Sequence, residues 1–237
     1  MNIKLRWIVA YLALFTLFLS LGAWQISRAN QKQDFLNLEA KRVSEKIELT
    51  AQTFEDISAL RYKPASVIGH FETSKQFLLD NQINTGKAGY FVFTPFKLEN
   101  SNKAILVNRG WIPLIEPRTN LPNVDFSAES RMILTGRINN FPSIGLKLSG
   151  ANIPTNSNPA VVGLMDSQVL AKQLGYELFN FQLELDATAS NGFKREWVAA
   201  QIMQPEQHLA YALQWFGLAL VLTFIFIKFA LKKESQK

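Results

Sequence analysis

An uncharged hydrophobic stretch near the C-terminus constrains this chain most. Nineteen consecutive residues, 209–227, carry no formal charge. As an α-helix rising about 1.5 Å per residue, they would extend roughly 28 Å, which matches the hydrocarbon thickness of a bilayer. With Pro205 as a favourable first-turn residue, the sequence predicts a transmembrane helix over 205–227.

A second apolar run, 7–24, follows Lys4 and Arg6. A signal peptide shows the same order of charge and apolar core, and residues 20–22 form a weak cleavage site. The run is longer than a typical signal core, however, and Trp24 stands at its end as interfacial aromatic anchors do. We therefore expect an uncleaved first span.

Almost all of the net charge of +6 at pH 7 comes from the two tails, 1–6 and 228–237. The segment between them holds nineteen basic and eighteen acidic residues. This near-neutral balance argues against nucleic acid as a partner, because nucleic-acid-binding domains concentrate positive charge on their folded part. The positive-inside rule places the tails 1–6 and 228–237 in the cytoplasm. We expect a multi-pass protein of the bacterial inner membrane, in contact with lipid, whose main domain is periplasmic.

The chain contains no cysteine. Disulfides and thiolate sites for copper, zinc or iron–sulfur clusters are therefore excluded. An exported domain of this composition must be held together by packing.

Residues 25–63 are rich in helix formers and predict a helical connector that continues the first span. From Pro64 to residue 204 the sequence changes to short runs rich in Val, Ile, Phe and Leu, separated by turn residues. We predict a short helix over 166–174 and an irregular loop over 145–159. Strands are predicted over 65–71, 76–83, 89–98, 103–114, 131–138, 179–186 and 195–203.

The short links between these runs favour antiparallel pairing. The predicted fold class is thus a membrane protein in which two transmembrane helices flank an extracytoplasmic α+β domain. That domain is expected to be mainly an antiparallel sheet or a partly open barrel.

Catalytic signatures are not found: the sequence has no nucleophile elbow, zinc-protease helix, phosphate loop or dinucleotide turn. His70 lies in a predicted strand, where a half-buried or surface histidine needs no catalytic role. Glu184 and Asp186 alternate with leucines, so both carboxylates share one face, which a solvated sheet surface explains. We expect no catalytic residue and no enzyme.

His208 occupies a more suggestive place, in the first turn of the second span. Tyr211 and Trp215 follow three and seven residues later, on the same side of a helix. An interfacial anchor explains all three, while an aromatic pocket wall with one nitrogen ligand is the alternative. Gln214 favours a partner, since an amide in lipid is costly, and the outer end of the first span, 22–25, is the expected one.

Arg28 and Arg109 are the two arginines of interest. Arg28 lies one helical turn beyond Trp24, and Arg109 lies just before Gly110 and Trp111, near the end of a predicted strand. Surface ion pairing explains both, and carboxylate recognition at the membrane surface is the alternative.

Three motifs give the chain a family resemblance: Gly-x-Trp-Gln-x-x-Arg at 22–28, Asn-Arg-Gly-Trp at 108–111 and His-x-x-Tyr-Ala-x-Gln-Trp-Phe at 208–216. In this order, from about 21 to 220, the chain resembles the Surfeit locus protein 1 family of biogenesis factors for haem-copper cytochrome oxidase. The two-span topology also matches.

The resemblance implies a non-enzymatic assembly factor that binds or presents haem a to the oxidase catalytic subunit, with the haem a synthesis machinery as a further partner. His208 matches the proposed ligand of the haem iron. The expected cofactor-binding set is His208, Tyr211, Gln214, Trp215, Trp24, Gln25, Arg28 and Arg109. Trp24, Tyr211 and Trp215 would flank the apolar ring, and Arg28 or Arg109 would pair with a propionate.

Two other functions remain open. A cofactor-free membrane chaperone would stabilise an oxidase assembly intermediate with the same two spans and domain. A membrane-tethered sensor or scaffold unrelated to oxidase would share the topology alone.

Overall fold

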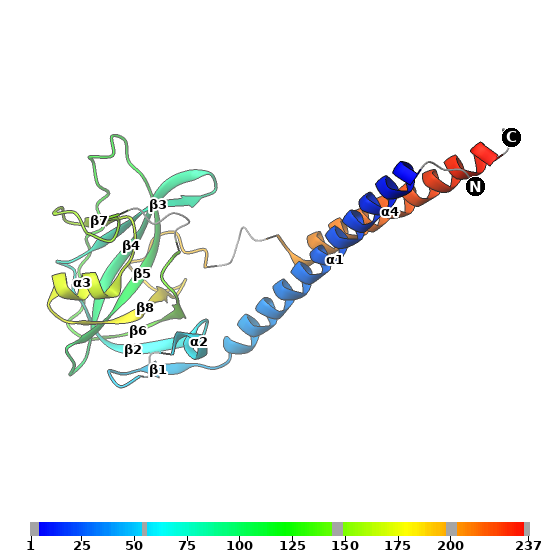
Figure 1. The fold of residues 1–237 in the computed structure, drawn as a ribbon. Coiled ribbons are helices and arrows are strands. Elements are labelled where there is room, and N and C mark those ends of the chain that lie inside the picture. Colours follow the sequence, from blue (N-terminus) through cyan, green and yellow to red (C-terminus); the bar gives the residue numbers. More distant parts are fainter. Residues whose placement is uncertain (1–4, 54–55, 144–148, 198–202, 235–237) are drawn as a thin grey trace. The chain divides into compact units, whose positions relative to one another are not determined.

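The computed structural model describes residues 5–53, 56–143, 149–197 and 203–234. The chain divides into two compact units: Met1–Glu39 with Gln201–Lys237, and Ala40–Ala200. The first unit is a pair of helices and the second is a β-rich domain (Figure 1).

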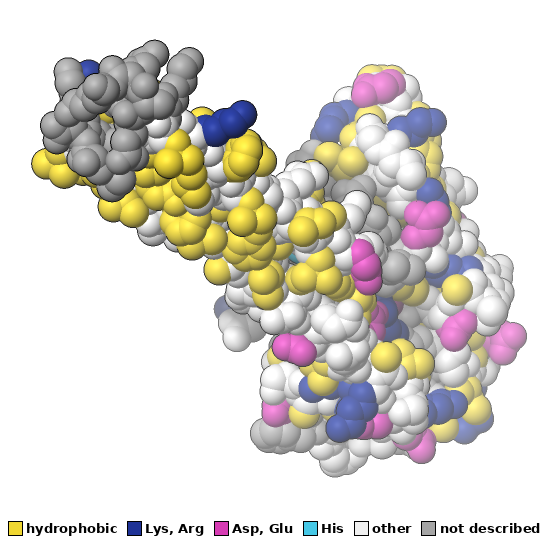
Figure 2. Space-filling view, turned by 90° about the vertical axis from the view of Figure 1, so that its right-hand side faces the viewer, with side chains coloured by type: hydrophobic (Ala, Val, Ile, Leu, Met, Phe, Trp, Pro, Cys, Tyr) yellow, Lys and Arg dark blue, Asp and Glu magenta, His cyan; other side chains and the backbone are white. Residues whose placement is uncertain are grey.

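The helical unit consists of α1, Leu5–Arg42, and α4, Pro205–Glu234. Both helices are long and apolar enough to cross a membrane. They lie side by side in opposite directions, so the start of α1 and the end of α4 lie at one end of the pair (Figure 1). Hydrophobic side chains gather along the pair, whereas charges are spread over the β-rich domain (Figure 2).

Small residues allow α1 and α4 to approach closely. A Cβ atom on Gly22 would lie 2.5 Å from the Phe216 ring, so the ring would have to shift to accept any other residue there. Further along the pair, the Tyr11 ring stacks on Phe226 at 4.3 Å. The Tyr11 hydroxyl also hydrogen-bonds the Thr223 hydroxyl at 3.1 Å. The contact therefore combines close packing with a satisfied polar pair, as helix pairs in membranes require.

The domain is built around a closed ring of five strands. β2 bonds to β6, β6 to β8, β8 to β5, β5 to β4, and β4 returns to β2. The β5–β8 pair is parallel and the other four are antiparallel. These strands are β2 Pro64–Phe71, β4 Lys87–Leu98, β5 Lys103–Pro113, β6 Met132–Asn139 and β8 Glu177–Leu185.

Shorter elements extend this barrel. β1 pairs in parallel with β2, while β3 pairs antiparallel with β4 and parallel with β7. α3 is capped by the Asp166 carboxylate, which accepts from two backbone N–H groups, and ends at the left-handed Gly175. The additional elements are β1 Ile47–Leu49, α2 Ile57–Leu60, β3 Phe77–Asn84, β7 Ala160–Val162 and α3 Ser167–Leu174.

The barrel interior is filled by side chains. Alternate residues of β2 point inward, and the exposure of Ala65, Val67 and Phe71 is 6% or less. Phe96, Ile105, Phe181 and Leu183 are fully buried in the same cluster. The two apolar helices flanking a barrel-like β domain confirm the predicted fold class, with the sheet closed rather than partly open.

Three local predictions differ from the structure. The helix that continues the first span ends at Arg42 instead of covering 25–63, because 47–49 pair with β2. The strand β7, which follows the predicted loop, was not predicted; residues 149–159 are irregular as expected, and 145–148 lie outside the described residues. The antiparallel expectation misses the parallel pairs of β1, β7 and β8, which join segments distant in sequence.

The last predicted strand, 195–203, is wrong for Arg195, Glu196, Trp197 and Met203, which are not in a strand, while 198–202 lie outside the described residues. Side chains hold this segment instead. The Arg195 guanidinium donates to the carbonyls of Asp186 and Ala189. The Trp197 indole donates to the carbonyl of Leu185 at 2.7 Å.

Gly69 lies where β2 pairs with β4 and closes the barrel, and this position gives the first prediction. A Cβ there would lie 1.9 Å from the carbonyl oxygen of Lys97, on the strand that β2 meets at the closure. We expect Gly69→Ala to lower the free energy of unfolding by about 1–3 kcal/mol, because β2 and β4 must separate. Thermal unfolding of the full chain in detergent, followed by circular dichroism, measures the effect.

Gly163→Ala is the control, because its nearest neighbour would lie at 3.3 Å and is a side-chain atom. A Gly69→Ala melting temperature equal to that of Gly163→Ala would show that the closure does not depend on this close approach.

Candidate functional site

His208 contacts the first helix at the place where the two resemblance motifs meet. Its Nδ1 lies 2.7 Å from Oε1 of Gln25. An amide oxygen only accepts hydrogen bonds, so Nδ1 is the donor, and in the neutral imidazole Nε2 is then the nitrogen with a free lone pair. Histidine ligands of metals are commonly held in this way, with the second ring nitrogen donating to a carbonyl. The residues therefore fit a haem, whose iron Nε2 would bind.

The start of α4 fixes the position of this histidine. The Gln207 side chain reaches back and accepts from the backbone N–H of Gln204 at 2.9 Å. This contact is the glutamine half of a capping box, and Pro205 takes the first helical position. His208 is therefore held in the first turn, half-buried against α1.

Trp215 lies on the same side of α4 as His208. The centre of its ring is 5.8 Å from that of Phe18. Ala212, which lies between His208 and Trp215 in the sequence, is buried at 3% exposure. Tyr211 is 44% exposed and lies beside this contact. The structure thus brings His208, Gln25 and Trp215 to the interface of the two helices, with Tyr211 at its border.

Trp24 and Arg28 form a second contact on α1. The Arg28 guanidinium lies 5.7 Å from the centre of the Trp24 ring, and Nη1 donates to Gln31 at 3.2 Å. Trp24 is 51% exposed and Arg28 is also exposed. Since both are within one turn of Gln25, an aromatic surface and a cation lie next to the hydrogen-bonded pair of His208 and Gln25.

Gln214 is not brought to α1. It is exposed, and its side chain makes no hydrogen bond with any residue that the structure describes. Gln25, at the expected partner position on the first helix, instead bonds His208. Gln25, which was expected to pair with Gln214, is therefore hydrogen-bonded to His208 instead.

Arg109 lies in the interior of the β-rich domain, with 2% exposure. Its Nε donates to the carbonyl of Asn191 at 2.7 Å, and Nη1 donates to Gln76 at 2.8 Å and to the carbonyl of Val124 at 2.9 Å. The Phe126 and Phe193 rings lie 4.0 and 5.0 Å from the guanidinium carbon. Burial lowers the pKa of Arg109 to about 10, so it remains charged at neutral pH.

The rest of the Asn-Arg-Gly-Trp motif is also used internally. The Asn108 side chain accepts from the backbone N–H of Gly110 and donates to Gln182, each at 3.0 Å. Gly110 has φ +113°, a conformation that favours glycine. The Trp111 indole donates to the carbonyl of Gln82 at 2.8 Å. The motif ties β5 to its neighbours.

The two carboxylates predicted to share a face have different surroundings. Glu184 is 5% exposed, pairs with Arg137 at 2.8 Å and accepts from Asn139 at 2.8 Å. Asp186 instead accepts from the backbone and hydroxyl of Thr188, which lowers the pKa of its carboxyl. The solvated sheet face is therefore wrong for Glu184, which is a buried ion-pair partner.

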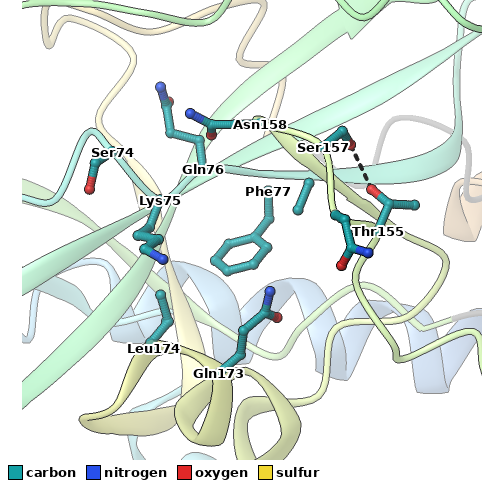
Figure 3. Close-up of a pocket in the computed structure, with 11 residues that line it drawn as sticks. Ser74, Lys75, Gln76, Phe77, Thr155, Ser157, Asn158, Gln173 and Leu174 are labelled. Carbon is teal, nitrogen blue, oxygen red and sulfur yellow. Dashed lines mark hydrogen bonds between the residues drawn. The ribbon is translucent and has the colours of Figure 1, made fainter.

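The domain also has a polar pocket that the sequence reading missed (Figure 3). It has a volume of about 280 Å³, and Lys75 is the cation among its lining residues. One wall comes from the segment predicted to be an irregular loop, so no periodic pattern could have revealed it. The lining residues are Ser74, Lys75, Gln76, Phe77, Thr155, Asn156, Ser157, Asn158, Ala160, Gln173 and Leu174.

Within the described residues, no cluster of three or more His, Asp or Glu side chains could hold a metal ion. A metal held by His208 would therefore have one imidazole ligand from the described residues. One protein ligand would suit a haem, because the macrocycle supplies the other nitrogen ligands of the iron.

Comparison with known proteins gives a consistent result over nearly the whole chain. The SURF1 family model matches residues 12–220. A SURF1-like protein of Rickettsia conorii is 29% identical over 233 residues, covering 90% of this chain and 86% of the relative. A Rickettsia bellii SURF1-like protein is 30% identical with the same coverage. The Surfeit locus protein 1 of Xenopus tropicalis is 27% identical over 250 residues, covering 98% and 77%.

The buried guanidinium gives the second prediction. Arg109→Lys keeps the charge but loses the fork that reaches Asn191, Gln76 and Val124 together. We expect the free energy of unfolding to fall by about 2–4 kcal/mol, because buried acceptors lose a charged donor. Thermal unfolding of the full chain measures this change.

Arg118→Lys is the matched control, since Arg118 pairs with Asp80 on the surface and its side chain is 53% exposed. Its expected effect is below about 1 kcal/mol. If Arg109→Lys were as mild as this control, the buried network would not stabilise the domain.

Proposed function

Because the chain belongs to the SURF1 family, we propose that it is a non-enzymatic assembly factor for haem-copper cytochrome c oxidase. In this proposal it binds haem a at the outer membrane interface and presents it for insertion into the catalytic subunit. The observation that supports this most is the His208–Gln25 hydrogen bond, which leaves Nε2 available as a ligand.

The ring would be held by the residues around that bond. When bound, haem a supplies an iron centre in an apolar macrocycle with two anionic propionates and a long isoprenoid tail. Such a molecule suits a site that is apolar on one side and charged on the other. His208 would ligate the iron, Trp24, Tyr211 and Trp215 would contact the ring, and Arg28 would pair with a propionate.

Gln25 has a positioning role in this site. Its amide oxygen accepts from Nδ1, so it selects the imidazole tautomer and holds the ring against α1. Arg109 and Gln214 do not enter the proposed site. The guanidinium of Arg109 is occupied by four acceptors inside the domain, and Gln214 does not face α1.

We further propose the bacterial inner membrane as the location. The basic residues Arg6 and Lys228 flank the apolar segments at the same end of the helix pair, which favours the cytoplasm for that end (Figure 1). The β-rich domain would then lie on the periplasmic side. The oxidase catalytic subunit and the haem a synthesis machinery are the proposed partners.

A cofactor-free chaperone is the second candidate. It is favoured by the surface of the helix pair, where many large apolar side chains are exposed, including Leu213 at 74% and Leu220 at 72%. Such a surface could hold an unassembled membrane subunit without a cofactor. In that case His208 and Gln25 would serve only to join α1 to α4.

Haem binding gives the third prediction. In protein purified from cells that make haem a, we expect His208→Ala to reduce bound haem by about tenfold or more, because the iron loses its protein ligand. Gln25→Leu should cause a smaller loss than His208→Ala, because it removes the group that orients the ligand and leaves the ligand itself. Absorption spectra of equal amounts of purified protein measure the haem content.

His70→Ala is the matched control, since His70 is the other histidine and lies on β2 in the domain. It should retain the haem content of the unaltered chain. Equal haem in His208→Ala and His70→Ala would remove His208 from the site. Association with the catalytic subunit in cells without haem a would favour the chaperone.

A further inference from the structure

The side chain of Gln214 identifies a face of α4 that the helix pair leaves open. Gln214 is two residues from Ala212, which is buried against α1 at 3% exposure. Two residues correspond to a rotation of about 200° around a helix, so Gln214 projects from the opposite side. In a bilayer this side faces lipid or another protein.

The depth of Gln214 makes an unpartnered amide costly. It lies six residues beyond His208, or about 9 Å further along the helix, within the uncharged segment 209–227. No described residue bonds its side chain, whereas Thr223, deeper in the same segment, bonds Tyr11 and the carbonyl of Ala219. The amide therefore needs a hydrogen-bonding group from outside this helix pair.

The neighbours of Gln214 on this face permit a second helix to come close. Ala210, Gln214, Gly217 and Val221 are separated by four, three and four residues, which is the spacing of a helix-packing stripe. A Cβ added to Gly217 would meet no atom within 4 Å, and Val221 is 55% exposed. Small residues on either side of a polar one are typical of helix interfaces in membranes.

We propose that this stripe is the interface of a homodimer, in which α4 of one copy packs in parallel against α4 of a second copy. A second copy always presents its own Gln214 at the same depth, because both chains have the same orientation in the membrane. A primary amide both donates and accepts, so two Gln214 side chains satisfy each other reciprocally. This reciprocity favours the second copy, which supplies the matching polar group without a partner of different sequence.

The rest of the stripe is compatible with this arrangement. Phe224 and Lys228 continue the same spacing. Lys228 ends the stripe about 21 Å beyond Gln214, at the basic end of the segment, where water and lipid head groups solvate its charge. The inference does not rest on the proposed function, since neither His208 nor haem takes part in this face.

Cross-linking in native membranes tests the dimer, because the chain has no cysteine of its own. Val221→Cys lies on the stripe, and Leu220→Cys is its matched control at nearly the same depth but about 100° around the helix. Both side chains are exposed, at 55% and 72%. We expect mild oxidation to give at least about five times more disulfide-linked dimer for Val221→Cys than for Leu220→Cys.

Adding Gln214→Leu to Val221→Cys should reduce the dimer to the level of the Leu220→Cys control, because the amide pair is lost. Gly217→Ile in the same background should act similarly by blocking close approach, and it leaves the amide intact. The expression level and melting temperature of each variant establish that the chain is folded.

Three results of the cross-linking would overturn the proposal, and a dilution experiment supplies a fourth. These are equal cross-linking at the two cysteine positions, a dimer unaffected by Gln214→Leu, and a cross-linked species that contains a different protein. Co-expression of the cysteine-free chain should dilute the dimer, and failure to do so would also contradict it.

Discussion

The close contact between α1 and α4 is the interaction on which the proposed site depends. Gly22 allows the Phe216 ring to lie against the helix backbone, and this approach places Gln25 beside His208. A larger residue at position 22 would displace the Phe216 ring and loosen this contact. A histidine with one ring nitrogen fixed and the other free then follows from the packing of two apolar helices, without a preformed pocket.

The β-rich domain shows how buried polar groups can stabilise a structure without taking part in ligand binding. Arg109 resembles a binding residue in the sequence because it belongs to a compact motif, yet its guanidinium connects β5 to three other segments in the interior. The pair of Glu184 and Arg137 acts similarly, and Arg137 also donates to the carbonyl of Trp197. A chain without cysteine thus relies on buried hydrogen bonds as well as packing.

Some of the described polar side chains in the helices have a hydrogen-bond partner within the helix pair and others do not. We infer different roles for them from this difference. Tyr11, Thr223, Gln25 and His208 have partners within the helix pair. Gln214 has none among the described residues and lies on the opposite side of α4. The bilayer makes the difference informative, because hydrocarbon offers no hydrogen bonds to an exposed amide.

The sequence by itself determined the two spans, most of the strands and the membrane-protein class, because length, hydrophobicity and alternation are local properties. It also pointed to His208 and to the outer end of the first helix. Only the tertiary structure decided that Gln25 rather than Gln214 makes the contact, that Arg109 is buried, and that β8 pairs in parallel with β5. These depend on which residues distant in sequence come together, and residue type and spacing do not encode that choice.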